Sequence, residues 1–589
     1  MRSLIAVAAL LVSSIPCSGQ GRVINVPADT STIQAAVNMA QDGDTVLVAE
    51  GLYYENVLIQ SKSIVVGSHF LIDGDSSHIA RTIINGSRPA NTDLASVVRI
   101  RGCRDTTTVL CGFTITGGFG NRQPDGSTYV RTSAGIGVPG SSALIAHNRI
   151  LGNAVTKASV PDAYESVTGG GIGVFTRGVG GTCVVVRDNL IADNTIEGHF
   201  SCGAGVAIIT DIPGDTAHFI IERNVIRGNT NKELGTWKGM GGGLSLGVDF
   251  PSYGIKVIRD NIIDHNRVVG ALADTRTFGG GVYIVYTDTP SGTVDPDPGE
   301  LFYNNIISHN HSDYLGGGVS IWRFSSETTH LTSWGNYVPR PTFINNTIVN
   351  NSAQDGPGFF IMDHVPFLMN NILWDEPKDS TQWGEIYLGD VPEWLRWHGP
   401  NTYRDVRLCY SAIRGGWKDA PGVIDSDPLL DSTYRLMDAS PCIGNGIDTF
   451  RVENILYHAP LFCFYGGERP RPKGSRPDIG ACENRLAIPI AGAVREWASA
   501  LPVAFALKQN YPNPFNPSTT IEYVLPAASD VRLIVYDLLG REVSVLVNER
   551  RDAGIHEVKF DGSGLSSGVY LYRLQVGEFV QTRKAVCLQ

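Results

Sequence analysis

The chain has 589 residues, of which 67 are glycine and 18% are charged, and its formal net charge is −11 at pH 7. This length exceeds what one ordinary hydrophobic core supports, so a repeat array or several domains are expected. Abundant glycine without a long charged block favours turn-rich β structure over disorder or a coiled coil. The acidic balance gives no reason to expect nucleic-acid binding.

The N-terminus has the pattern of a secretory signal peptide. Arg2 precedes the apolar run 4–12, which is followed by small residues. Because the run is too short to span a bilayer, residues 1–19 are predicted to be a signal peptide that is removed before Gln20. No later segment has the length and apolarity of a transmembrane segment. An exported chain can form disulfides, but the ten cysteines leave their pairing open, and free buried thiols are the alternative.

The centre of the chain repeats one phrase six times: Asn, any residue, Ile, two variable residues, Asn. The copies are 148–153, 189–194, 224–229, 261–266, 305–310 and 346–351. They alternate with glycine turns that lead into apolar–variable–apolar segments, such as 241–246, 279–284 and 316–321. Such segments are typical of strands with one buried face. The undecorated repeat is 25 residues, from Asn346 to Asn371, and longer spacings indicate insertions.

This fixed-period self-similarity predicts a solenoid whose stacked coils share one core. The second asparagine of each phrase should then form a column from coil to coil. Asparagine tolerates left-handed backbone at a bend, and stacked amides can hydrogen-bond to one another. The predicted structural residues are Asn153, Asn194, Asn229, Asn266, Asn310 and Asn351.

With these phrases, residues 22–485 resemble the right-handed parallel β-helix proteins of the pectin-lyase-like superfamily. Residues 32–40 resemble the amphipathic helix of their N-terminal cap, and 42–59 resemble their first coil. The resemblance implies an all-β chain with a β-helix over 20–421. It implies no particular reaction, because this scaffold carries lyases, hydrolases, epimerases and proteins without known catalysis. Of the polygalacturonase signatures the chain has only Asn-Thr-Asp, at 91–93, and the catalytic signatures of pectate lyases are not recognisable.

One candidate site is a column of carboxylates. Asp211, Asp249 and Asp288 each begin an Asp-x-Pro segment after a glycine strand. If they stack about 5 Å apart, they could bind calcium or act as an acid/base pair. The alternative is that Asp-x-Pro ends each strand and starts a loop.

A second candidate site lies further along the same face. Tyr283, Trp322 and Phe360 are predicted near the surface, and Arg323, Asp363 and His364 follow the last strands. Aromatic faces flanked by charged groups suit sugar rings, and Asp363–His364 resembles the Asp-His pair of some pectate lyases. The alternative is that these aromatic residues cover the joints between coils.

Two histidines occupy equivalent positions in adjacent coils, His265 and His309, with His311 nearby. A histidine pair could bind a metal ion if a third ligand were present. No third ligand type is evident in the sequence, which favours an exposed turn.

Residues 422–485 resemble the terminal module of exported bacterial β-helices, with matching pieces at 425–430, 434–446 and 476–483. We expect this module to close the open end of the helix, whose last strands would otherwise invite edge pairing. Cys442 and Cys482 fall within two of these pieces and are the preferred disulfide.

After a linker at 486–504, residues 505–589 change pattern. Predicted strands at 530–537, 541–547, 554–560 and 568–575 indicate a small Ig-like β-sandwich. The segments YPNPFNPSTTI (511–521), DLLGREV (537–543) and SSGVYLYRL (566–574) resemble the C-terminal sorting domain of the type IX secretion system. The resemblance implies passage across an outer membrane, followed by release or attachment at the cell surface.

The sequence therefore predicts a secreted or cell-surface β-helix protein, a monomer, that associates with polysaccharide through no assignable reaction. Its partners would be the type IX machinery and a glycan, and calcium is the one cofactor suggested. Two alternatives stay open: a polysaccharide lyase or glycoside hydrolase acting on acidic glycans, and a non-catalytic adhesin.

Overall fold

The computed structural model describes two compact units, one up to residue 487 and one from residue 506 on. The described residues are 21–125, 128–156, 166–176, 181–210, 216–248, 254–272, 275–287, 299–324, 341–362, 364–375, 384–389, 406–452, 455–487, 506–507, 510, 515, 517–525, 529–537, 541–551, 554–566, 568–576 and 579–587.

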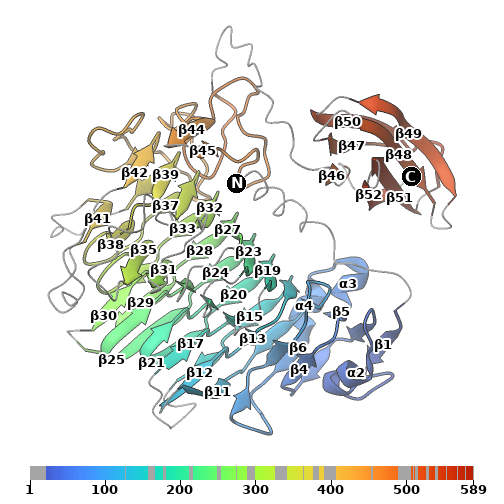
Figure 1. Cartoon of the computed structure of the whole chain (residues 1–589), viewed down its shortest axis with the longest axis horizontal. Coiled ribbons are helices and arrows are strands. Elements are labelled where there is room, and N and C mark those ends of the chain that lie inside the picture. Colours follow the sequence, from blue (N-terminus) through green and yellow to red (C-terminus); the bar gives the residue numbers. More distant parts are fainter. Residues whose placement is uncertain are drawn as a thin grey trace. The chain divides into compact units, whose positions relative to one another are not determined.

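The first unit is a parallel β-helix, as predicted, with three long sheets that we call A, B and C. In Figure 1 the strands of successive coils follow one another from the blue end to the yellow end. The 12 strands of sheet A are β1 (Val23–Val26), β2 (Thr45–Val48), β5 (Val65–Ser68), β9 (Val109–Cys111), β14 (Ala143–Ala146), β19 (Cys183–Arg187), β23 (His218–Glu222), β27 (Lys256–Arg259), β32 (Glu300–Tyr303), β36 (Thr342–Ile344), β39 (Phe367–Met369) and β42 (Arg407–Cys409). The 11 strands of sheet B are β3 (Gly51–Tyr53), β6 (Thr82–Asn85), β10 (Thr114–Thr116), β15 (Arg149–Leu151), β20 (Leu190–Ala192), β24 (Val225–Arg227), β28 (Ile262–Asp264), β33 (Ile306–Ser308), β37 (Thr347–Val349), β40 (Ile372–Trp374) and β43 (Ala412–Ile413). The 10 strands of sheet C are β4 (Val57–Gln60), β8 (Val98–Arg101), β13 (Ile136–Pro139), β18 (Ile172–Phe175), β22 (Val206–Thr210), β26 (Leu244–Val248), β31 (Val282–Thr287), β35 (Val319–Phe324), β38 (Phe359–Met362) and β41 (Ile386–Leu388).

The repeated phrase sets the path of each coil. Its first asparagine lies at the corner between sheets A and B, its Ile is the inward residue of the sheet B strand, and its second asparagine follows that strand. The glycine turn then leads into sheet C. Because the inward residues of all three sheets are mainly Val, Ile and Phe, the coils share one continuous core. The predicted 25-residue repeat is confirmed where Thr347 pairs with Ile372.

A fourth sheet, D, arises from insertions between sheets B and C. It has 10 strands: β7 (Leu94–Ala95), β11 (Gly120–Asp125), β12 (Thr128–Thr132), β16 (Ala154–Val155), β17 (Ser166–Thr168), β21 (Thr195–Cys202), β25 (Thr230–Met240), β29 (Arg267–Gly270), β30 (Arg276–Phe278) and β34 (His311–Ser312). Most of its pairings are parallel, with antiparallel pairing of β11 to β12 and to β7. The longer spacings of the repeat indicate these insertions but not the additional sheet that they form.

The N-terminal end of the core is covered by a helix, as expected. Helix α2 (Ile33–Met39) buries Ile33 and Val37 in the main core. Its N-cap Thr32 accepts a hydrogen bond from the Ala35 amide, and the Glu55 carboxylate accepts from the Ile33 amide at 2.9 Å. A carboxylate at this end satisfies amides that lack an intrahelical partner. Two short helices, α3 (Phe70–Asp73) and α4 (Ser77–Arg81), decorate the second coil.

The terminal module makes two kinds of contact. Val423 of the module, with Trp417 and Ala420 just before the module begins, packs against the main core beyond the last strands. The rest of the module lies along the outer faces of sheets A and B, where Tyr434 packs near Ile306 and where a hairpin of β44 (Thr449–Val452) and β45 (Ile455–His458) forms. The end of the solenoid is therefore covered by the segment around 417–423, and most of the module covers the side of the last coils.

The preferred disulfide prediction is wrong. Cys442 and Cys482 are free thiols in separate apolar clusters, Cys442 beside Ile372 and Cys482 beside Ile306. Burial raises the pKa of each thiol to about 12, which keeps both sulfurs protonated.

The second unit is the predicted β-sandwich. One antiparallel sheet contains β46 (Ala506–Leu507), β47 (Ser518–Leu525) and β50 (Gly554–Asp561). The other contains β49 (Glu542–Arg551), β48 (Ser529–Tyr536), β51 (Gly568–Val576) and β52 (Phe579–Cys587). Residues of both sheets, such as Ile521 and Leu533, share one core. Among the described residues of both units, no helix has the length and apolarity needed to cross a membrane.

Candidate functional site

The structure brings the six predicted structural asparagines together in one buried column. Asn229 illustrates the pattern: its side-chain amide donates to Asn266 Oδ1 at 2.9 Å, and its Oδ1 accepts from the side chain of Asn194 at 2.9 Å. The first asparagine of each phrase, followed by Asn371, forms a second column, which was not predicted from the sequence. The members of this second column are Asn148, Asn189, Asn224, Asn261, Asn305, Asn346 and Asn371. Both columns are architectural because their amide groups are occupied by neighbouring coils.

The carboxylate column cannot be placed. Asp211, Asp249, Asp288 and Asp363 all lie outside the described residues. Of the described strands that precede the first three, β22 and β26 have five residues each and β31 has six. Val248 pairs with Thr210 and with Tyr286, and β31 continues to Thr287.

The expectation that three aromatic residues lie near the surface is wrong. Tyr283, Trp322 and Phe360 are each no more than 2% exposed. They stand on the outer face of sheet C, but the ends of the sheet D strands, with Met240 and Phe278, cover them in a second apolar cluster. The Phe278 and Trp322 ring centroids are 5.0 Å apart. The insertions that build sheet D therefore turn a predicted surface patch into a core. Arg323 lies on β35, and its side chain is outside the described residues.

His364 has a different environment from the one expected. It is fully buried, and its ring centroid lies 4.5 Å from that of Tyr286, which comes from the end of β31. The Tyr286 hydroxyl donates a short hydrogen bond to Glu300, the first residue of β32. His364 therefore belongs to a polar cluster at the corner between sheets C and A.

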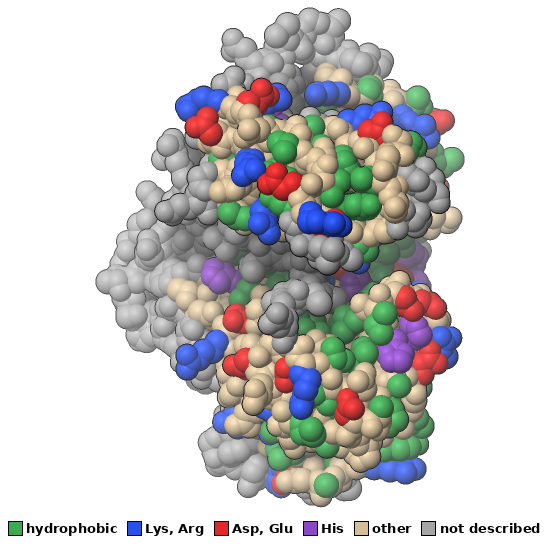
Figure 2. Space-filling model, turned by 90° about the vertical axis from the view of Figure 1, so that its right-hand side faces the viewer, with side chains coloured by type: hydrophobic (Ala, Val, Ile, Leu, Met, Phe, Trp, Pro, Cys, Tyr) green, Lys and Arg blue, Asp and Glu red, His purple; other side chains and the backbone are tan. Residues whose placement is uncertain are grey.

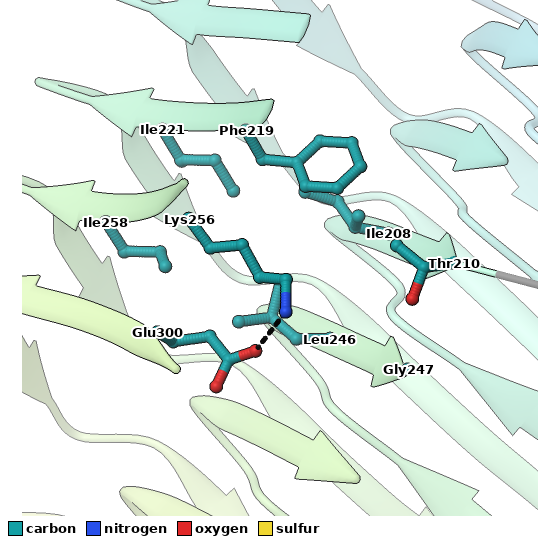
Figure 3. A pocket seen from close by; sticks show the side chains of 9 residues that line it. All are labelled: Ile208, Thr210, Phe219, Ile221, Leu246, Gly247, Lys256, Ile258 and Glu300. Atoms are coloured by element: carbon teal, nitrogen blue, oxygen red, sulfur yellow. Dashed lines mark ion pairs between the residues drawn. The ribbon is translucent and has the colours of Figure 1, made fainter. Parts of the chain in front are cut away.

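We call Lys256, Tyr286, Glu300 and His364 the strand-end cluster. Lys256 and Glu300 are register partners on the inward row of sheet A, and Lys256 Nζ lies 3.4 Å from Glu300 Oε1. Figure 3 shows this ion pair among apolar side chains such as Phe219 and Ile258. A cavity of about 10 Å³ lies beside it, with Thr210 also on its lining, which is about the space that one water molecule needs.

The strand-end cluster contains groups that can donate or accept protons. It joins an amine, a carboxylate, a phenol and an imidazole within one corner of the β-helix. Only His364 was a sequence-based candidate. Lys256 and Glu300 could have been noticed in the sequence, because each is a charged residue at the start of a predicted strand. The equivalent inward position in the preceding coils holds Val184 or Phe219.

A pair of buried acidic residues, Asp375 and Glu385, lies at the end of the asparagine column. Asp375 Oδ1 accepts from the Asn351 side chain at 3.2 Å, and Glu385 Oε1 accepts from the Asp375 amide at 2.8 Å. A Cβ added to Gly358 would lie 2.9 Å from the Glu385 backbone oxygen and 3.0 Å from Asp375 Oδ2, so a larger residue there would have to displace its neighbours. Burial raises the pKa of Asp375 to about 7, and burial together with Asp375 raises that of Glu385 well above its ordinary value.

The histidine pair is also brought together. The rings of His265 and His309 are stacked with centroids 4.7 Å apart. His311 turns away, with Nδ1 at 2.8 Å from Ser352 Oγ and Nε2 at 2.9 Å from Asp313 Oδ1.

Comparison with known proteins identifies the second unit. Residues 509–588 match the family model described as a secretion system C-terminal sorting domain. No curated protein and no solved structure matches the chain. The sorting domain directs export, so this chain is a β-helix protein that the type IX secretion system delivers to the cell surface or the extracellular space.

Proposed function

We propose that the mature protein binds polysaccharide outside the cell, through the outer face of sheet D. The observation that carries this proposal is a row of polar side chains on four adjacent strands. The row consists of Thr195, Thr230, Arg267 and His311, which are register partners. None of the four is buried, whereas the next row, with Ile196 and Val268, is buried.

The surroundings of this row suit a glycan. Glu197 and Lys232 form an ion pair at 3.3 Å on the same face, and the Phe200 side chain on β21 is exposed. Adjacent strands lie about 4.8 Å apart, so an extended chain lying across them would meet hydrogen-bonding groups at regular steps. Sugar C–H groups pack on aromatic rings while hydroxyl groups take hydrogen bonds from polar side chains.

The charge distribution favours a neutral glycan over an acidic one. The sequence carries a net charge of −11, and on sheet D the acidic Glu197 accompanies the basic Lys232. Figure 2, drawn from another side, likewise shows Lys and Arg interspersed with Asp and Glu. Mixed charges of this kind provide little long-range attraction for a polyanion.

The experiment is a glycan-binding screen with the full-length mature chain, by glycan array and by co-sedimentation with insoluble polysaccharides, with and without calcium. The double variant Phe200→Ala/Arg267→Ala should weaken binding at least tenfold, because it removes the ring and a charged donor. Tyr54→Ala, which removes an exposed ring outside sheet D, is the matched control. Wild-type binding by the double variant would contradict the proposal.

The second candidate is a polysaccharide lyase or glycoside hydrolase, and the strand-end cluster is the observation that favours it. In an enzyme, Tyr286→Phe should lower turnover about 100-fold or more, because a positioned acid or base contributes at least that factor. Asp249→Ala tests the carboxylate column that the sequence predicts. Product is measured as new reducing ends or unsaturated sugars. Wild-type turnover in both variants would exclude this corner, and binding without any product would identify a non-catalytic adhesin.

A further inference from the structure

The corner after sheet B places two histidines side by side. His265 follows β28 and His309 follows β33, and the residues just before them, Asp264 and Ser308, are register partners. Both histidines adopt left-handed backbone, with φ of 55° and 52°. Their ring planes are only 9° apart in orientation, and both side chains are substantially exposed. The same position in other coils holds Gly152, Asp193, Gly228 or Asn350.

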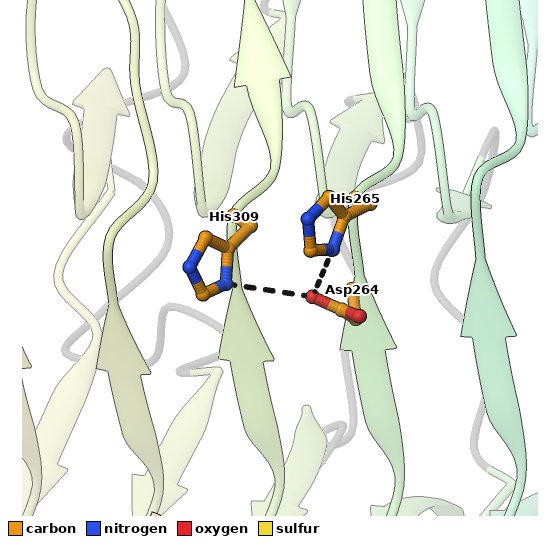
Figure 4. Close-up of side chains that lie close together, drawn as sticks. All are labelled: Asp264, His265 and His309. Atoms are coloured by element: carbon orange, nitrogen blue, oxygen red, sulfur yellow. Dashed lines mark hydrogen bonds and ion pairs between the residues drawn. The ribbon is translucent and has the colours of Figure 1, made fainter. Parts of the chain in front are cut away.

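A carboxylate completes the group. Asp264 Oδ1 lies 2.6 Å from His265 Nδ1 and 3.6 Å from His309 Nδ1, as Figure 4 shows. One ligand atom from each residue lies within 4.8 Å of the other two. Around Zn²⁺ with bonds of about 2.0–2.2 Å, ligand atoms stand roughly 3.3 Å apart in a tetrahedron, so small side-chain rotations bring all three within reach of one ion.

A neighbouring hydroxyl holds the carboxylate in place. Ser308 Oγ donates to Asp264 Oδ1 at 3.1 Å and lies 2.8 Å from the Tyr434 hydroxyl. Tyr434 is also 3.3 Å from His309 Nδ1, a contact that an ion bound at this nitrogen would replace. Such outer partners orient metal ligands. Arg227 Nη2 lies 3.7 Å from Asp264 Oδ2 and opposes a cation, but its side chain is half exposed and its charge is screened by solvent.

We propose that Asp264, His265 and His309 form a binding site for one divalent transition-metal ion, of the Zn²⁺, Co²⁺, Ni²⁺ or Cu²⁺ class. Two imidazoles with one carboxylate suit these ions, whereas calcium prefers an all-oxygen set. Three protein ligands leave a fourth position for water or for a group of another molecule. Because the two rings come from adjacent coils, the ion would link those coils. This site is independent of the proposed glycan surface.

The variants are chosen to preserve the fold. His265→Asn and His309→Asn place at these corners the residue that Asn350 already provides at the same position, with φ of 59°. Asp264→Asn removes the carboxylate charge at nearly constant shape. His311→Asn is the matched control, because His311 is the next histidine along the chain and is bonded elsewhere.

The measurement is calorimetric titration of the full-length mature chain, without a histidine tag and after chelator treatment, with Zn²⁺, Co²⁺ and Ca²⁺. The visible spectrum of bound Co²⁺ reports its coordination. The double variant His265→Asn/His309→Asn should lose one bound ion per chain relative to wild type, and each single variant, Asp264→Asn included, should weaken that ion at least tenfold. The control His311→Asn should keep it.

Circular dichroism checks that each variant is folded. The proposal is overturned if the folded double variant binds as many Zn²⁺ ions as the wild type, if the wild type binds neither Zn²⁺ nor Co²⁺, or if His311→Asn alone removes the ion.

Discussion

Lys256 and Glu300 illustrate how a single buried ion pair can affect the stability of the core. Both are less than 4% exposed, and they follow the apolar residues Val184 and Phe219 in the same inward row. Removing two charges from water has a large desolvation penalty, which their mutual attraction offsets only when the geometry is good. Each of the two buried charges is therefore compensated only while its partner is present.

This dependence gives the first prediction. Lys256→Met should lower the free energy of unfolding by about 3–5 kcal/mol, because it leaves the Glu300 carboxylate buried without its counterion. The double variant Lys256→Met/Glu300→Gln should recover much of this loss. Urea denaturation followed by circular dichroism measures both. Equal losses in the single and double variants would show that the two charges are not coupled.

Asp375 gives a prediction for the dependence of stability on pH. Its pKa is about 7 in the folded protein, compared with about 3.9 in an unfolded chain. The folded state therefore holds a proton that the unfolded state has lost, so the contribution of this group is complete below pH 4 and is lost as pH rises toward 7.

Asp375→Asn should remove this slope. The amide also extends the asparagine column by one member, since Asn351 already donates to the side chain at 375. The melting temperature of the variant should exceed that of the wild type at pH 8 and the difference should shrink toward pH 4. Thermal unfolding at a series of pH values measures this. A constant difference across that range would contradict the assigned pKa.

At the scale of elements, the asparagine columns join the strands of successive coils. Each inner amide serves the coil on both sides and also donates to a backbone carbonyl, as Asn229 does to Ile191 O at 3.0 Å. Buried polar groups of this kind contribute mainly because leaving one unsatisfied is unfavourable.

Asn229→Ala should therefore destabilise the β-helix by about 1–3 kcal/mol for each polar group that it leaves unsatisfied. Asn194 and Ile191 both lose a partner in this variant. Asn445→Ala is a control, because Asn445 is an exposed residue whose side chain donates to Pro441 O. Urea denaturation compares the two. Similar small effects would mean that the column does not hold the coils together.

The sequence predicted the coils well because their determinants are local. An asparagine phrase and a glycine turn recur in each coil, and each specifies a corner or a strand without reference to distant residues. Sheet D could not be predicted in this way, since β21 and β25 follow the repeat with unequal insertions. The burial of Tyr283 and Trp322 depends on that sheet and was missed for the same reason.

The candidate sites show the same limit. Asp264 directly precedes His265, yet its nearness to His309 depends on a coil offset of 44 residues that only the register reveals. Lys256 and Glu300 are likewise far apart in the sequence, and they are neighbours only because β27 pairs with β32. Aligned phrases predicted the asparagine column and the histidine pair, whereas a contact between unlike segments, such as that of Tyr286 with Glu300, requires the three-dimensional register.

At the scale of the whole molecule, the sorting domain decides where the β-helix works. Its strands and core are separate from those of the solenoid, and it matches the secretion family over 509–588. Truncation after residue 504 should leave the β-helix folded but retained in the cell-associated fraction. Immunoblots of cells and culture medium measure this, and secretion of the truncated chain at the wild-type level would contradict the assignment.

The columns of asparagine have a consequence for how such a chain can change. Each inner coil offers the next one the same donor and acceptor that it received, whether the offset between the paired asparagines is 25 or 44 residues. Coils are in this sense interchangeable modules, so cutting the chain at one asparagine and rejoining it at its counterpart one coil later would restore the same contact. Shortening or lengthening this protein by whole turns should thus be tolerated far better than changing it by a single residue within a strand.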